Sequence, residues 1–192
     1  MAERDFRVLT TQELGQLYNE RMKEDFPANE LKPLPWLIRL TEEGYYEPYG
    51  FYRDGTLVAY ALFWGAGEEP CVMLDYFAVV PRERNRKVGG SLIKAMAELF
   101  GKRGLSVFLE TEAPVTGDKE TDDLRRRRIA FYERSGCRRV GYTCKAFGVP
   151  YIVMTFGPEI GEEELMKIHR RIYHSVLDDK LYEQNILIPE EL

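Results

Sequence analysis

The sequence lacks the features that mark membrane proteins and secreted proteins. Its longest weakly polar stretch, from Leu57 to Gly67, has 11 residues, well short of the roughly 18 that suggest a membrane span. The first ten residues, MAERDFRVLT, carry charges where a secretion leader needs an apolar run. No Asn-x-Ser/Thr glycosylation site occurs. We therefore expect a cytoplasmic protein with no membrane partner.

Cysteine and histidine are scarce, which argues against disulfide frameworks and metal sites. The three cysteines, Cys71, Cys137 and Cys144, are an odd set without CxxC spacing. The two histidines, His169 and His174, are five positions apart, which is about 140° around a helix and unsuited to sharing one ion. We expect both histidines to be structural and the protein to hold no metal.

Positive charge is concentrated in two windows of an otherwise acidic chain. Residues 82–103 hold seven Lys/Arg against two Asp/Glu, and residues 125–139 hold seven against one. With a net charge of −5, the remainder therefore carries about −16. The windows are either two solvated faces or two parts of a site for a polyanionic ligand. The acidic remainder and the lack of a nucleic-acid-binding motif argue against nucleic acid.

Hydrophobic periodicity and turn signals predict a mixed sheet covered by helices. Thr10 and Glu13 form a capping-box pattern before the first helix, and Asp54-Gly55 predicts a hairpin. The expected strands are Phe6–Leu9, Tyr46–Arg53, Thr56–Trp64, Cys71–Val80, Leu105–Glu110, Arg138–Cys144 and Tyr151–Phe156. The expected helices follow Thr10 and the basic loop and span Leu34–Thr41 and Leu124–Arg134, with a polar loop at Thr116–Asp123 and a last amphipathic helix over 162–176.

The basic loop RERNRKVGGSLIKAM, from Arg82 to Met96, lies between a buried strand and a helix. Backbone N–H groups at such a helix start, aided by the helix dipole, bind anions well. The loop contains neither GxxxxGK[ST] nor GxGxxG. Taken alone, it is either a solvated turn or a phosphate site.

The wider stretch AVVPRERNRKVGGSLI resembles the acyl-CoA-binding motif of the GNAT acetyltransferase superfamily. In that motif an apolar strand and Val-x-Pro precede Arg/Gln-x-x-Gly-x-Gly/Ala and a helix. Arg84 takes the Arg/Gln position and Gly89 the last glycine, whereas Lys87 replaces the first glycine. Downstream, IAFYERSGCRRVGY is similar to the family's second signature, with Tyr132, Glu133 and Gly136 matching and Cys137 replacing the usual Phe.

The resemblance implies a fold, a domain and a cofactor. The fold is α/β (α+β), with a GNAT-like mixed, mostly antiparallel central sheet flanked by helices and a C-terminal amphipathic helix. The acetyltransferase domain would span 1–157, and 158–192 would form a helical extension packed on it or at a dimer interface. Acetyl-CoA would be the acyl donor. Its binding residues would be Phe77, Ala78, Val79, Arg84, Asn85, Arg86, Lys87, Val88, Gly89, Gly90 and Ser91.

The implied reaction is direct transfer of the acetyl group from the thioester to an amine. Tyr132 would protonate the leaving thiolate, or it is a core tyrosine beside Ile129. Glu110 is the favoured base ahead of Asp75, which sits in a strand that reads as buried and must be paired, neutral or functional. Both acids could instead form a rim that binds the amine without taking its proton.

The acceptor is expected to be a small, cationic amine, because an acidic approach attracts protonated amines. An alternative is an acyl-CoA-binding regulatory module without turnover. The departures at Lys87, at Cys137 and at Arg128, which stands where the resembled signature commonly has Ala, leave it open. The exposed edges and the terminal helix are compatible with a homodimer. The aromatic residues Trp36, Tyr45, Tyr46 and Tyr49 would border the acceptor pocket or fill the core.

Overall fold

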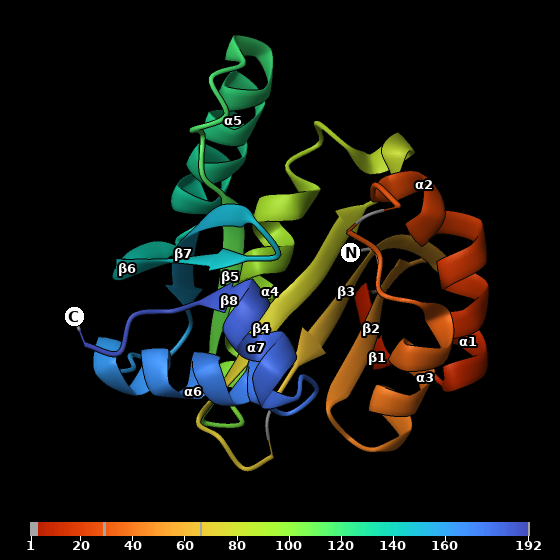
Figure 1. Ribbon diagram of the computed structural model, residues 1–192. Helices are drawn as coiled ribbons and strands as arrows, with labels where there is room; N and C mark the ends of the chain where they lie inside the picture. The colour runs from red at the N-terminus through yellow and green to blue at the C-terminus, as the bar shows by residue number, and fades with distance from the viewer. Residues whose placement is uncertain (1–3, 29, 66, 192) are drawn as a thin grey trace. The chain divides into compact units, whose positions relative to one another are not determined.

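The computed structural model describes residues 4–28, 30–65 and 67–191 (Figure 1). Over these residues the strands form one mixed, mostly antiparallel eight-stranded sheet in the order β1-β2-β3-β4-β5-β7-β6-β8. This confirms the predicted sheet flanked by helices. The chain divides into two compact units, Met1–Gly67 with Asp75–Gly89, and Glu68–Leu74 with Gly90–Leu192. Strand β4 (Cys71–Val79) and helix α4 (Val88–Gly101) each run from one unit into the other.

The first unit joins an antiparallel meander to a group of short helices. Strand β2 pairs with β1 on one side and β3 on the other, and α1 and α3 contact each other, with α3 also against β2 (Figure 1). The strands are β1 (Arg4–Val8), β2 (Tyr46–Arg53) and β3 (Thr56–Trp64). The helical elements are α1 (Thr11–Leu17), the π-helix η1 (Tyr18–Met22), α2 (Lys23–Asp25), α3 (Leu34–Glu42) and the 3₁₀-helix η2 (Pro81–Glu83).

Two local sequence signals set the geometry of the first unit as predicted. The Thr10 side chain accepts a hydrogen bond from the Glu13 amide while the Glu13 carboxylate accepts one from the Thr10 amide, which completes the capping box. The hairpin between β2 and β3 turns at Asp54 and Gly55, with φ of 49° and 72°. Both angles lie in the left-handed region, which Asp tolerates and Gly adopts freely.

The second unit is built on strands that pair largely antiparallel. The start of β4 pairs in parallel with β5, which pairs antiparallel with β7, and β6 then joins β7 to β8. The strands are β5 (Ser106–Glu112), β6 (Arg138–Ala146), β7 (Val149–Phe156) and β8 (Ile186–Leu187). The helices besides α4 are α5 (Lys119–Arg134), α6 (Glu162–His174) and α7 (Asp179–Asn185).

Some predicted boundaries in the second unit were wrong. Helix α5 begins at Lys119, where a loop to Asp123 was expected, because Asp118 caps it by accepting from the Thr121 amide. Its first turns are rich in charged residues and carry no apolar periodicity. Strand β5 continues to Glu112, and α7 and β8 were not predicted.

Helix α6 packs in the second unit through the apolar stripe that the sequence predicts. Leu165, Ile168 and Ile172 are buried along it, and α6 contacts α7. The boundary between a domain at 1–157 and an extension at 158–192 stays a prediction. In the described part of the chain, no helix has both the length and the apolar character needed to cross a bilayer. All three cysteines are free and buried.

Candidate active site

The basic loop after β4 contains two residues with positive φ. Its chain passes twice through the left-handed region, at Asn85 (φ 61°) and Lys87 (φ 60°), directly before α4 begins at Val88. Asn tolerates this conformation, but Lys seldom adopts it. Lys87 therefore keeps a backbone geometry that suits the glycine of the resembled motif. Turns of this kind and helix starts both direct N–H groups at anions.

Arg84, the motif arginine, holds the loop in place within the first unit. Its Nε donates to the Val79 carbonyl over 2.9 Å, and its NH2 group lies 2.6 Å from Oδ1 of Asp25. The Asp25 side chain is only 4% exposed and also accepts from the Tyr60 hydroxyl over 2.9 Å. A buried carboxylate thus fixes the Arg84 guanidinium. Lys87 and Arg86 remain exposed.

Asp75 is paired, as its place within a strand requires. Lys32, from the loop between α2 and α3, places its Nζ 2.7 Å from Oδ2 and 2.9 Å from Oδ1 of Asp75, and the Tyr46 hydroxyl donates to Oδ2. Asp75 precedes the proposed cofactor-binding positions Phe77, Ala78 and Val79 on β4, which are half-buried. Sequence reasoning placed Asp75 correctly in a strand and missed its partner.

Glu110 lies at the centre of a buried polar cluster in the second unit. Its Oε1 accepts from the Cys144 thiol over 3.0 Å and lies 2.8 Å from Nε2 of His169, and its Oε2 accepts from the Tyr173 hydroxyl over 2.9 Å. The Tyr142 hydroxyl lies 3.2 Å from Nδ1 of His169. Three elements, β5, β6 and α6, therefore meet at one carboxylate.

The surroundings of Glu110 keep it ionised. Burial acts to raise its pKa, but hydrogen bonds from His169, Cys144 and Tyr173 and the charge of His169 outweigh burial, so the pKa lies below its usual range. The imidazole Nε2 then carries a proton and donates to the carboxylate. Burial and the neighbouring carboxylate also raise the pKa of Cys144 well above its usual range.

The donor atoms of Glu110, Cys144 and His169 lie within 4.8 Å of one another. That spacing would suit a metal ion, but hydrogen bonds to Glu110 account for the positions of both partners. His169 is fully buried in this cluster and hydrogen-bonded to Glu110, and the structural role expected for it stays a prediction. His174 lies apart from it and stacks on Tyr182, with ring centroids 3.7 Å apart.

Tyr132 on α5 is the other predicted catalytic residue in the second unit. Its ring contacts Phe131 edge-on at 5.1 Å, and the residue is half-buried. Burial raises the pKa of Tyr132 to about 12. The phenol therefore keeps its proton at neutral pH and has that proton available to donate.

The arginines of α5 are largely engaged by acidic residues. Arg125 and Arg128 both bind the carboxylate of Glu112, Arg128 over 2.9 Å, and Arg126 pairs with Asp123 over 2.8 Å. Glu112 therefore neutralises part of the second basic window.

Gly90 lies at the start of α4 and packs closely against another helix end. A Cβ added at Gly90 would lie 3.3 Å from Oγ of Ser135, so there is little room for a side chain there.

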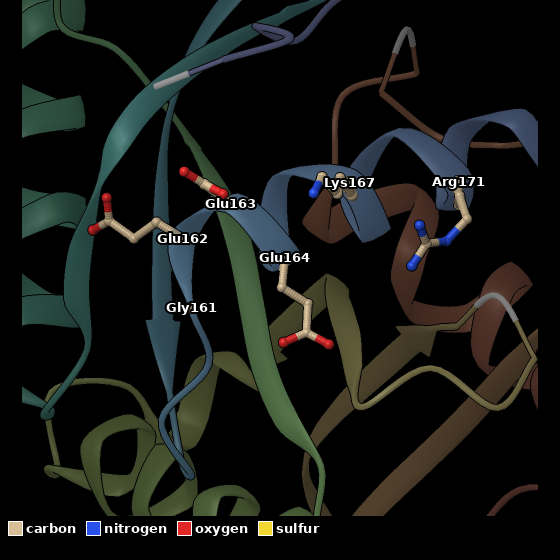
Figure 2. Close-up of a pocket in the computed structure, with 6 residues that line it drawn as sticks. All are labelled: Gly161, Glu162, Glu163, Glu164, Lys167 and Arg171. Carbon is tan, nitrogen blue, oxygen red and sulfur yellow. The ribbon is translucent and has the colours of Figure 1, made fainter.

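A hollow of about 630 Å³ lies over the exposed side of α6 (Figure 2). Glu164 and Arg171 point to the same side of the helix there (Figure 2), and Arg171 binds Glu69 through two nitrogens at 2.5 and 2.8 Å. The Glu110 cluster uses the opposite, buried side of α6. The lining residues are Gly161, Glu162, Glu163, Glu164, Lys167 and Arg171, all exposed.

Comparison with known proteins gives one family and many similar folds. The model of the acetyltransferase (GNAT) family matches residues 11–137. A Bacteroides thetaiotaomicron protein described as a GNAT acetyltransferase is 22% identical with a TM-score of 0.72, covering 90% of this chain and 97% of its own. No curated protein matches the sequence.

Two further solved structures carry substrate names. A spermidine N-acetyltransferase chimera from Vibrio cholerae and hSSAT is 11% identical with a TM-score of 0.59, covering 81% of this chain and 95% of its own. An aminoglycoside acetyltransferase, AAC(6')-Ib, solved with coenzyme A and kanamycin, is 18% identical with a TM-score of 0.59 and the same coverage, 81% and 95%. At these identities the similarity shows a shared fold.

Proposed function

Because the chain belongs to the GNAT family of acetyltransferases, we propose that it transfers the acetyl group of acetyl-CoA directly to the amine of a small, cationic acceptor. The family match carries this proposal, since it spans the basic loop, Asp75, Glu110 and Tyr132. The GNAT reaction forms an amide bond at the amine nitrogen and breaks the thioester C–S bond. The amine must lose a proton, and the CoA thiolate gains one.

The cofactor would bind along β4 and the loop that follows it. Backbone groups of Phe77, Ala78 and Val79 would hold the pantetheine arm, and the turn from Arg84 to Ser91 would receive the pyrophosphate. The two left-handed residues, Asn85 and Lys87, support this assignment. With Arg84 held by Asp25, Arg86 and Lys87 are the side chains that could pair with phosphate, together with the N–H groups at the start of α4.

Tyr132 would protonate the leaving thiolate. A pKa of about 12 keeps the phenol protonated at neutral pH, so that it holds a proton when the thiolate departs.

Glu110 would accept the proton of the amine. Its lowered pKa makes Glu110 a weak base, and the Nε2–H of His169, 2.8 Å away, would hold the carboxylate in position. Asp75 is the second acidic group and already binds an ammonium, that of Lys32. That contact supports Asp75 as a group that can bind a cationic acceptor.

The names of similar proteins agree with an amine acceptor. One acts on spermidine and one on aminoglycosides, and the second was solved with coenzyme A. By analogy we place this chain among acetyltransferases of small cationic amines. The cytoplasmic location and a homodimer stay predictions of the sequence.

A thiol-release assay tests the proposal. The protein is incubated with acetyl-CoA and an amine library that contains polyamines, amino sugars, amino acids and anionic amines. We expect steady CoA release with cationic members, and we expect Gly89→Asp to weaken acetyl-CoA binding at least about tenfold, roughly 1.4 kcal/mol, by placing negative charge in the loop. Tight acetyl-CoA binding without turnover of any amine would favour the regulatory module instead, and a screen won by anionic amines would contradict the cationic acceptor.

A further inference from the structure

The Lys32 ammonium lies in a box of one carboxylate and several aromatic rings. Nζ is 5.1 Å from the ring centre of Trp64 and 5.2 Å from that of Tyr76, in addition to its contacts with Asp75. The Lys32 and Asp75 side chains are 19% and 10% exposed. A carboxylate combined with aromatic faces is the chemistry with which proteins recognise ammonium groups.

The box is assembled from strand residues, whereas its occupant comes from a loop. Tyr46 begins β2 opposite Trp64, which ends β3, and their rings stack with centroids 5.6 Å apart. Asp75 and Tyr76 come from β4. The walls are therefore fixed by sheet pairing, and the side chain of Lys32 enters from outside the sheet.

The backbone beside Lys32 is held, so only its side chain needs to move. The Lys32 amide donates to the Tyr76 hydroxyl over 2.9 Å, and that hydroxyl donates to the Glu30 carbonyl over 2.7 Å. The four-carbon stem of lysine is flexible. Departure of the ammonium alone would leave a nearly buried carboxylate unpaired, which is costly, but exchange for another ammonium preserves the charge balance.

We propose that Asp75, Tyr46, Trp64 and Tyr76 form the site for an ammonium group of the acceptor, and that Lys32 occupies this site until a cationic alkylamine displaces it. This inference rests on the proposed function, which supplies the amine acceptor. Phe77, where the acetyl end of the cofactor would begin, lies two residues from Asp75 on the same strand, about 7 Å along it. An amine held at Asp75 would thus lie beside the group it must attack.

Binding of n-butylammonium chloride tests the site without requiring turnover. This probe has the four-carbon chain of lysine, and n-butanol is a neutral control of the same length. By calorimetry at constant ionic strength, we expect Lys32→Ala to bind n-butylammonium at least about tenfold more tightly than wild type, because the competing ammonium is gone. The exposed Lys23→Ala variant should match wild type, and Lys32→Ala with Asp75→Asn should lose the binding.

Kinetics test whether Lys32 competes with the acceptor. With the best amine from the thiol-release screen, Lys32→Ala should lower KM at least about fivefold and leave acetyl-CoA affinity unchanged. Should Lys32→Ala not fold without a cation, Lys32→Gln keeps most of the side-chain length, removes the charge and carries the same comparison.

The two proposals fail in different ways. An unchanged or raised KM, or equal affinity of Lys32→Ala for n-butylammonium and n-butanol, would overturn the exchange and make Lys32–Asp75 a structural ion pair. A wild-type protein that releases no CoA with any amine would refute the proposed function, and the n-butylammonium titration would still decide whether the ammonium site exists.

Discussion

Nε2 of His169 lies 2.8 Å from Oε1 of Glu110, joining helix α6 to strand β5 through a charge-assisted hydrogen bond in the interior. The two residues are 59 positions apart in the sequence. His169 is fully buried and the Glu110 side chain is 7% exposed. An interaction of this kind is costly to break from one side, because the remaining partner stays buried without compensation.

Replacing His169 by Phe, which keeps a ring but no donor, should destabilise the protein by about 3 kcal/mol. Glu110 has a lowered folded pKa, so its stabilising contribution is present above its unfolded value and is lost as the pH falls through the folded value. Wild type should therefore lose stability on acidification below about pH 4.5, and Glu110→Gln should show a flatter acid limb. Urea unfolding at pH 7 and pH 4 measures both effects. The exposed Glu133→Gln variant is the control, and a His169→Phe protein as stable as that control would contradict the coupling.

The three cysteines should not react in the folded protein. Burial raises the pKa of Cys71 and of Cys137 to about 12, and burial with the Glu110 carboxylate raises that of Cys144 further. Because the thiolate is the reactive form, iodoacetamide at pH 8 should label none of the three until denaturant is added. Mass spectrometry before and after unfolding measures this, and rapid native labelling of Cys144 would show that the Glu110 cluster opens.

The sequence predicted interactions between residues close together in the chain and missed interactions between residues far apart in it. The capping box of Thr10 and Glu13 and the Asp54-Gly55 hairpin are local, and both were predicted correctly. The Lys32–Asp75 pair spans 43 positions, and no periodicity in a single sequence points to such a pair. His169 was interpreted against His174, its sequence neighbour, whereas its partner in the fold is Glu110.

Charge patterns in the sequence predicted the site less well than hydrophobic patterns predicted the fold. The arginines of α5 form a basic window in the sequence, yet two of them bind the carboxylate of Glu112 in the fold. Glu112 lies on β5 and the arginines on α5, so the sequence pattern did not show this pairing. The start of α5 was missed because its first turns carry charges and no apolar stripe. The side-chain cap of Asp118 was the available signal.

Tyr132→Phe separates catalysis from packing on α5. The substitution keeps the ring and its contact with Phe131 and removes only the hydroxyl. If Tyr132 protonates the thiolate, kcat should fall on the order of 10²-fold or more, with acetyl-CoA affinity and the urea midpoint nearly unchanged. Steady-state kinetics and calorimetry measure these quantities on the same preparation. The neighbouring Phe131→Tyr variant should keep its activity, and full activity in Tyr132→Phe would assign Tyr132 to the core.

Substitutions at Lys87 should affect stability and acetyl-CoA affinity in opposite directions, because the backbone angle governs the first and the ammonium charge the second. Its φ of 60° is costly for a residue with a Cβ, by roughly 1 kcal/mol, and glycine removes that cost. Lys87→Gly should therefore be slightly more stable than Lys87→Ala, by up to about 0.5 kcal/mol after the higher chain entropy of glycine is deducted. If the Lys87 ammonium pairs with a phosphate of the cofactor, both variants should bind acetyl-CoA more weakly than wild type, about three- to tenfold at low salt, with the difference shrinking as salt is added. Urea unfolding and calorimetry at two salt concentrations measure the two effects separately. Equal acetyl-CoA affinity in all three proteins would leave the backbone of the loop, and not the lysine, as the group that holds the pyrophosphate.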